Sequence, residues 1–205
     1  MHTRWLALAM CLLAPSPAAA EWQLRPFIGF TFGGETTFLD PEKAIATQNA
    51  VIGVAGGWLG EIFGLEADFG RAPGFFQTDR QGDLSISTIA EAEVLTSAVT
   101  TLTGNVVIAL PARLAGYGLR PYFSGGAGLM HIDAVGQFQL FDLHRTLPAL
   151  SVGGGVTGFL ANNIGLSWDV RRLSTWRDEG ETLGNSLGRE RLSFWRATMA
   201  VALRY

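Results

Sequence analysis

The chain has 205 residues, of which 48% are hydrophobic and 16% charged, and its formal net charge is −3 at pH 7. This balance offers no basic patch for nucleic acid, and a single cysteine excludes a disulfide framework or a zinc site built on cysteine. Glycine is abundant, with 26 residues, whereas Lys43 is the only lysine. Glycine without a collagen-like period suits a tightly curved sheet, in which strands bend and pack against large neighbours.

The first twenty residues are typical of a secretory signal peptide. A positive start, an apolar stretch and three alanines follow one another. We expect cleavage before Glu21, which makes 1–20 the signal peptide and 21–205 an outer-membrane β-barrel domain. Cys11 leaves with the signal, so the mature chain has no thiol for nucleophilic catalysis.

The C-terminal residues alternate between two faces of a strand. The apolar face holds Trp195, Ala197, Met199, Val201, Leu203 and Tyr205, and the opposite face holds Arg196, Thr198, Ala200, Ala202 and Arg204. Because side chains of a strand alternate with period two, a strand separates these two sets and a helix does not. A strand of this length with one apolar face is typical of a lipid-facing membrane strand.

The same alternation recurs upstream and predicts eight strands. They span roughly 22–34, 50–60, 62–73, 94–110, 119–132, 148–160, 164–175 and 193–205. The connections alternate between short, at 60–61, 111–118 and 161–163, and long and polar, at 35–49, 74–93, 133–147 and 176–192. This order is expected when both termini lie in the periplasm. The sequence therefore predicts an all-β fold, an eight-stranded antiparallel up-and-down transmembrane β-barrel.

Two alternatives to membrane strands stay open. Residues 146–168 carry no charge, so a transmembrane helix satisfies a hydropathy criterion there. Five glycines, Pro148 and the pair Asn162-Asn163 interrupt this segment and favour two strands joined by a turn. A secreted soluble β-sandwich or lipocalin-like barrel also alternates, but it places apolar residues inside and charges outside. The terminal Tyr205 and the signal peptide favour the membrane.

Three segments resemble a known family. They are the last strand, which ends in Met199–Tyr205, the stretch Asn105–Pro111 followed by Leu119–Gly128, and Gly153–Val156 followed by Ile164–Arg171. The first, with Met199, Val201, Leu203 and Tyr205, resembles the C-terminal signal by which the outer-membrane assembly machinery recognises its barrels. The others are similar to the barrel domain of OmpA-like and opacity-protein-like porins. The resemblance implies an eight-stranded barrel inserted by that machinery, with no catalytic residues to transfer.

Charged residues gather on the face that a barrel in lipid turns inward. They are Arg25, Glu66, Asp68, Arg120, Asp169, Arg171, Arg196 and Arg204. An eight-stranded barrel has an interior just wide enough for side chains, and an unpaired buried charge is costly. We therefore expect these residues to form a network of ion pairs that closes the lumen.

Aromatic residues gather near the predicted strand ends. Trp22, Trp58, Phe63, Phe159 and Tyr205 lie toward the periplasmic ends, and Phe32, Phe75, Phe76 and Trp176 toward the outer ends. We expect two interfacial girdles. Phe75 and Phe76 begin the longest loop and could also contact a partner. The charged loop 176–192 is expected to be a solvated surface.

The mature chain has two histidines, His131 and His144. His131 is expected to face lipid near the outer end of its strand, where the base of a lipid A-modifying barrel enzyme would lie. Such deacylases pair a histidine with a serine two positions on, whereas this chain has Asp133 there. Since no nucleophile adjoins the base, we interpret His131 as a rim residue and expect no enzymatic activity.

These observations predict a non-catalytic barrel of the cell outer membrane that contributes to envelope structure and uses no cofactor, metal or nucleic acid. Its expected partners are outer-membrane lipid and lipopolysaccharide, the assembly machinery during biogenesis, and an unknown extracellular ligand at the four loops. A narrow porin-like channel for small solutes is the alternative, which the glycine-rich inner face supports. A lipid A deacylase or acyltransferase and an adhesin are further alternatives.

Overall fold

The computed structural model describes residues 21–36, 48–75, 94–111, 114–115, 118–136, 142–176 and 192–205. The predicted signal peptide at 1–20, Phe76 and the charged residues of 177–191 lie outside these ranges. Within the described ranges, no helix is long and apolar enough to cross a membrane.

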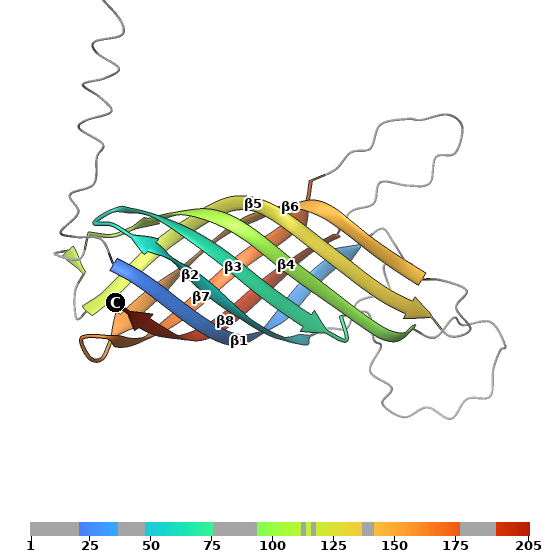
Figure 1. The fold of residues 1–205 in the computed structure, drawn as a ribbon, viewed down its shortest axis with the longest axis horizontal. Coiled ribbons are helices and arrows are strands. Elements are labelled where there is room, and N and C mark those ends of the chain that lie inside the picture. The colour runs from blue at the N-terminus through green and yellow to red at the C-terminus, as the bar shows by residue number, and fades with distance from the viewer. Residues whose placement is uncertain are drawn as a thin grey trace, which may run out of the picture.

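Eight strands form one closed barrel (Figure 1). They are β1 (Glu21–Thr36), β2 (Asn49–Leu59), β3 (Phe63–Pro73), β4 (Val94–Ala109), β5 (Leu119–Gly136), β6 (Asp142–Phe159), β7 (Ile164–Thr175) and β8 (Leu192–Arg204). Each strand pairs antiparallel with the next one along the chain, and β8 pairs with β1 to close the barrel. The predicted fold class, an all-β eight-stranded antiparallel up-and-down barrel, is confirmed.

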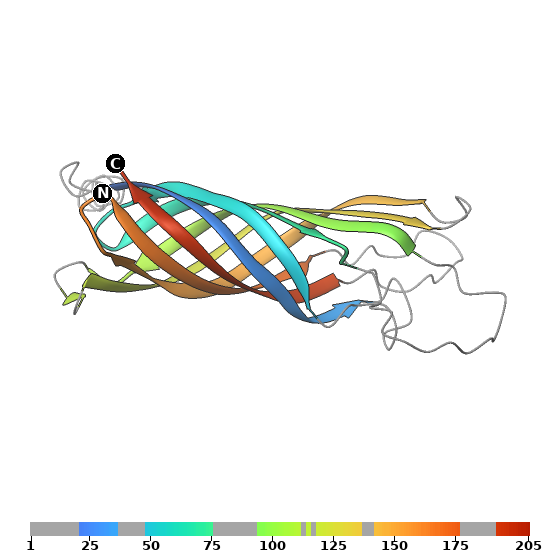
Figure 2. The ribbon, with the colours of Figure 1, turned by 90° about the horizontal axis from the view of Figure 1, so that it is seen from below.

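The start of β1 and the end of β8 lie at the same end of the barrel (Figure 2). There the backbone N–H of Tyr205 donates to the carbonyl oxygen of Trp22 at 3.0 Å. We call this the near end and the opposite one the far end. The three short connections, 60–62, 110–118 and 160–163, join strands at the near end, as predicted.

Side chains alternate between the outer surface and the lumen. Along β3, exposed and buried residues alternate without a break from Phe63 to Pro73. Leu65 and Phe69 point outward and are exposed, whereas Glu66 and Asp68 point inward and are buried. In this part of β3 the outward residues are apolar and the inward ones are charged, which suits a barrel in lipid.

The connection between β5 and β6 is much shorter than predicted. The sequence predicts a loop over 133–147, but β5 continues to Gly136 and β6 begins at Asp142. The far ends of both strands extend beyond β2 and β3 (Figures 1 and 2). The prediction is wrong because Asp133, His144 and Thr146 occupy outward-facing strand positions beyond the apolar surface, where a strand also carries polar residues.

Glycines on the inner face of β6 leave space for large side chains of the neighbouring strands. A Cβ atom at Gly155 would lie 2.1 Å from the carbonyl oxygen of Trp168 and 2.8 Å from the hydroxyl of Tyr122. A Cβ atom at Gly153 would lie 2.3 Å from the Cβ of Arg171. Glycine at these positions allows Tyr122 and Arg171 to fill the lumen.

Candidate functional site

Six charged side chains from four strands meet inside the barrel. They are Arg25 on β1, Glu66 and Asp68 on β3, Asp169 and Arg171 on β7, and Arg196 on β8. All six are buried and lie on the inward faces of their strands. In the order of the barrel, β3 and β7 lie on opposite sides, so contacts between them cross the lumen.

Glu66 connects two sides of the lumen. Its Oε2 accepts a hydrogen bond from Arg25, and its Oε1 accepts one from Arg171 Nη1 at 3.0 Å. Asn105 on β4 also donates to Oε1, at 3.2 Å. Both oxygens of this buried carboxylate are therefore satisfied, by partners on β1, β4 and β7.

Arg171 and Asp68 extend the network toward β8. Arg171 donates to both oxygens of Asp169, at 2.6 and 2.9 Å. Its Nη1 also lies 3.6 Å from Asp68. Asp68 in turn accepts two bonds from Arg196 Nη2, at 2.9 and 2.8 Å. Positive and negative groups alternate through the network, so each charge that leaves water on folding has an opposite neighbour.

Two of these arginines also lie on aromatic rings. The guanidinium carbon of Arg196 is 4.8 Å from the ring centre of Phe27, and that of Arg25 is 5.4 Å from the ring centre of Tyr122. The Tyr122 hydroxyl donates to Asp169 at 2.9 Å. Because Nε and Nη1 of Arg196 have no hydrogen-bond partner among the described residues, the ring face of Phe27 contributes to holding this charge.

An apolar cluster fills the lumen between these charges and the far end. Its members that are 2% exposed or less are Ala72, Phe75, Val99, Met130, Ile132, Ala149, Leu173, Leu192 and Phe194. The rings of Phe75 and Phe194 lie 4.9 Å apart. The predicted surface position of Phe75 is wrong, because Gly74, with a φ of 72°, turns the chain at the end of β3 and Phe75 packs inside.

Arg120 lies at the near end and does not join the central network. It donates to the carbonyl oxygen of Leu110 at 2.9 Å and to those of Gly60 and Glu61 at 2.7 Å each. Its guanidinium therefore holds together two connections, β2–β3 and β4–β5. The sequence did not indicate this role, because carbonyl acceptors in turns carry no residue signature.

Arg204 is also separate from the network, at the end of β8. It pairs with Glu21 at 3.1 Å and lies 4.3 Å from the ring centre of Phe159. Its side chain is 30% exposed. Arg204 occupies an inward-facing position of β8. Because it lies at the end of the barrel, its side chain pairs with a residue of β1 and is in contact with solvent.

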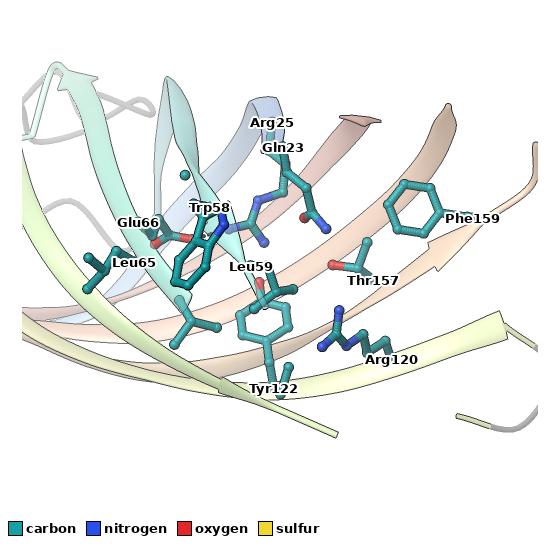
Figure 3. Close-up of a pocket in the computed structure, with 13 residues that line it drawn as sticks. Gln23, Arg25, Trp58, Leu59, Leu65, Glu66, Arg120, Tyr122, Thr157 and Phe159 are labelled. Carbon is teal, nitrogen blue, oxygen red and sulfur yellow. Dashed lines mark hydrogen bonds and ion pairs between the residues drawn. The ribbon is translucent and has the colours of Figure 1, made fainter. Parts of the chain in front are cut away.

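A small cavity near Arg120 is lined by both polar and apolar side chains (Figure 3). Gln23, Arg25, Glu66 and Thr157 contribute to its lining. A second cavity, beside Asp169 and Arg171, shares Arg25 and Tyr122 with the first. Each has room for about one water molecule, which is too little for a solute.

The predicted aromatic girdles are partly present on the outer surface. Trp22, Phe63 and Tyr205 are exposed at the near end, and Trp176 is exposed at the far end. Trp58 and Phe32 are half-buried, and Phe32 stacks on Trp195 with ring centres 6.5 Å apart. Phe159 lies on the inward face beneath Arg204. The residues of the predicted assembly signal, Met199, Val201, Leu203 and Tyr205, have the outward parity of β8.

A second polar cluster lies on the outward face of β5 and β6, next to the far end. His131 pairs across the strands with Thr146, and Asp133 pairs with His144. Toward the near end, the next outward residues are Leu129 on β5 and its partner Pro148 on β6, followed by Leu150, and both leucines are exposed. The cluster therefore begins where the apolar outer surface ends.

The side chains of this cluster contact one another. Thr146 Oγ1 lies 2.7 Å from His131 Nδ1, and His131 Nε2 lies 3.1 Å from Asp133 Oδ1. His144 Nδ1 lies 2.8 Å from the same oxygen. An ionised carboxylate only accepts hydrogen bonds, so His131 donates through Nε2, and in the neutral ring Nδ1 then accepts from the Thr146 hydroxyl. The hydrogen bond from His144 holds the pKa of Asp133 below its usual range.

Sequence reasoning located His131 on the outer face but missed Thr146. Thr146 is brought to His131 by the register of β5 against β6. The sequence predicts a loop over 133–147, and a residue in a loop has no strand partner. Among the described residues, no group of three or more His, Cys, Asp or Glu side chains is arranged to hold a metal ion.

No family model matches the chain, and no curated protein matches it either. Solved structures do match. Neisserial surface protein A aligns with a TM-score of 0.59 and 10% identity, over 91% of this chain and 99% of that one. The N-terminal β-barrel domain of Pseudomonas aeruginosa OprF aligns with a TM-score of 0.53 and 13% identity, over 90% of this chain and 97% of that one.

A major outer membrane protein from Thermus thermophilus aligns with a TM-score of 0.53 and 15% identity, over 91% of this chain and 100% of that one. At these identities the likeness defines the fold. The chain has the fold of small outer-membrane β-barrels, and the resemblance to OmpA-like and opacity-protein-like barrels is confirmed at that level.

Proposed function

We propose that this chain is an integral protein of the outer membrane whose barrel is closed by its own side chains. The near end then lies in the periplasm and the far end at the cell surface. Two observations support the location: the apolar outward face of the strands, and a fold shared with outer-membrane proteins.

The closed lumen rests on one observation, the ion-pair network that crosses the barrel. Glu66 on β3 binds Arg25 on β1 and Arg171 on β7, so these side chains occupy the lumen where a solute would pass. The apolar cluster around Phe75 and Phe194 lies beyond them. We assign this interior a structural role, in which the protein contributes a rigid barrel to the envelope.

Lipid and lipopolysaccharide are the proposed partners of the outward face. The outward residues Met199, Val201 and Leu203 of β8, together with Tyr205 directly after it, are the proposed signal for the assembly machinery during biogenesis. Their alternation with small and charged residues supports this role, because one face of the last strand is continuously apolar.

A narrow channel is the second candidate, and one specific observation favours it. The buried oxygens Ser124 Oγ, Ser151 Oγ and Asn105 Oδ1 have no hydrogen-bond partner among the described residues. Ser124 and Ser151 share the inward face of β5 and β6 with Gly126 and Gly153. Water along this wall would satisfy these atoms, and a continuous file of such water would conduct small ions.

Cysteine accessibility tests the closed lumen. In a Cys11→Ser background, Ser151→Cys places a thiol at a fully buried lumen position, and Ile62→Cys places one in an exposed near-end connection. We expect a membrane-impermeant maleimide to label the cysteine at position 62 and to leave the one at 151 unmodified until the protein is unfolded. Equal labelling of both cysteines in the folded protein would contradict a closed lumen and support the channel.

A further inference from the structure

Thr146, His131 and Asp133 form a hydroxyl, imidazole and carboxylate series on the outer surface. The hydroxyl is 2.7 Å from one imidazole nitrogen, and the carboxylate is 3.1 Å from the other. A hydroxyl beside a base that is oriented by a third group is the arrangement that activates nucleophiles in hydrolases. The series completes the constellation that the sequence alone left without a nucleophile.

The ring of His131 lies between two threonines and hydrogen-bonds one of them. Its cross-strand neighbours are Thr100 on β4 and Thr146 on β6. The ring binds the hydroxyl of Thr146, and its other nitrogen faces Asp133, two positions along its own strand. The strand ladder already satisfies the backbone here, so folding does not require these polar side chains to interact.

The position of the cluster along the barrel determines which bonds of a membrane lipid it can contact. Leu129 and Leu150, exposed outward residues on the near-end side of the cluster, contact hydrocarbon if the barrel lies in the outer membrane, as proposed above. The cluster then lies at the boundary between hydrocarbon and headgroups, where the ester bonds of acyl chains are found. The side chains of His131 and Asp133 are 44% and 33% exposed, so a lipid can approach them.

We propose that this cluster hydrolyses ester-linked acyl chains of outer-leaflet lipids, with Thr146 as the nucleophile and His131 as the general base. The inference rests on the proposed membrane location and replaces the expectation that the chain has no enzymatic activity. Asp133 is a positioning residue that orients the His131 ring. His144, when doubly protonated, donates to Asp133 through Nδ1 and has Nε2 available to donate to an oxyanion.

The reaction proceeds in two balanced steps. Thr146 Oγ1 attacks the ester carbonyl carbon while its proton passes to His131 Nδ1, and the alcohol leaves with that proton as its C–O bond breaks. Water then attacks the acyl-threonine, again gives a proton to His131, and Thr146 regains a proton as it leaves. The products are a fatty acid and the alcohol portion of the lipid, and no oxidant or cofactor is consumed.

The test uses the full mature chain folded in detergent micelles that carry either p-nitrophenyl laurate or lipopolysaccharide. Released nitrophenol is followed by absorbance and released fatty acid by mass spectrometry. Thr146→Val and His131→Gln are each expected to lower the rate by about 100-fold or more, since proton transfer and the nucleophile are both lost. Thr146→Ser keeps a hydroxyl and should retain activity. Thr100→Val, the matched control on the other side of His131, should leave the rate unchanged.

Folding is followed in each sample by heat-modifiable migration on a denaturing gel, so loss of the barrel and loss of the site are distinguished. If the folded wild type releases no product from either substrate, or if Thr146→Val keeps the wild-type rate, the proposal is overturned while the proposed barrel function stands. Asp133→Asn should lower kcat and leave KM unchanged; a change in KM alone would remove Asp133 from the positioning role. Fractionation of cells tests the membrane location separately.

Discussion

Glu66 and Asp68, two buried carboxylates of the lumen, depend on charged partners from other strands. Glu66 has two arginine partners and Asp68 has Arg196, and these carboxylates are 4% and 1% exposed. Removing water from two charges is expensive, and their attraction repays it when the geometry and further hydrogen bonds are good. Loss of one partner therefore leaves an uncompensated charge in the lumen, which is far more harmful than loss of a pair at the surface.

Glu66→Gln tests this point directly. The substitution leaves Arg25 and Arg171 without their shared carboxylate, and we expect the free energy of unfolding to fall by about 3–5 kcal/mol. Urea unfolding of the detergent-folded barrel, followed by tryptophan fluorescence, measures it. Glu21→Gln removes the exposed partner of Arg204 and should cost about 1 kcal/mol or less. Equal losses in the two variants would show that the lumen pairs add no more than surface pairs.

The lowered pKa of Asp133 makes the stability of the folded protein depend on pH. Its pKa is lowered in the folded protein by the hydrogen bond from His144, so its contribution to stability is fully present above the unfolded pKa. That contribution is lost as the pH falls through the folded pKa, which lies below the ordinary value of about 3.9. The melting temperatures of the wild type and Asp133→Asn should therefore differ at neutral pH and converge in strong acid. A difference that persists unchanged in strong acid would refute this assignment.

At the scale of elements, the two-residue alternation predicts most of the fold. It locates all eight strands, and it identifies Arg25, Glu66 and Arg171 as inward-facing, because parity along a strand is a local property. It fails where the outward residues of the strands change from apolar to polar. The polar residues beyond Leu129 and Leu150 continue the same strands, although their composition is that of a loop.

The candidate sites were less predictable than the strands, for a physical reason. The alternation along a strand shows whether a residue lies on the inner or the outer face. Which side chains then contact one another depends on the register of the strands and on the closure of the barrel. The Thr146–His131 pair requires the β5–β6 register, and the burial of Phe75 requires the turn at Gly74. Arg120 binds backbone carbonyl groups. Every residue has such a group, so the partners of Arg120 cannot be identified from the sequence.

The inward-facing glycines of β6 should be sensitive to substitution, because the neighbouring strands pack closely against them. Gly155→Ala places a Cβ against the Trp168 carbonyl and the Tyr122 hydroxyl, and overpacking of this kind costs about 1–3 kcal/mol. Gly125→Ala on β5 is the matched control, since a Cβ there meets nothing nearer than the Ser151 carbonyl oxygen at 4.0 Å. The control should remain within about 0.5 kcal/mol of the wild type in urea unfolding. Equal stability of both variants would contradict the tight packing of β6.

On the scale of the whole molecule, the interior has three successive regions. The near end holds Arg120 and a cavity for about one water molecule (Figure 3). The central network of six charges follows, and the apolar cluster around Phe75 and Phe194 lies toward the far end. The outward face is apolar until the polar cluster of His131 and Thr146. The charged and apolar side chains of the interior and the polar cluster of β5 and β6 therefore lie on opposite faces of the barrel wall.

Single-channel recording in a planar bilayer tests the central claim, the closed lumen, most directly. Purified wild-type protein, with its folding verified by heat-modifiable migration, should insert without producing a steady current at moderate voltage. The ion pairs of Glu66 and Asp68 span the lumen, and the cavities beside them have room for about one water molecule each. Reproducible unitary current steps from the wild type would contradict the account and establish a continuous water path.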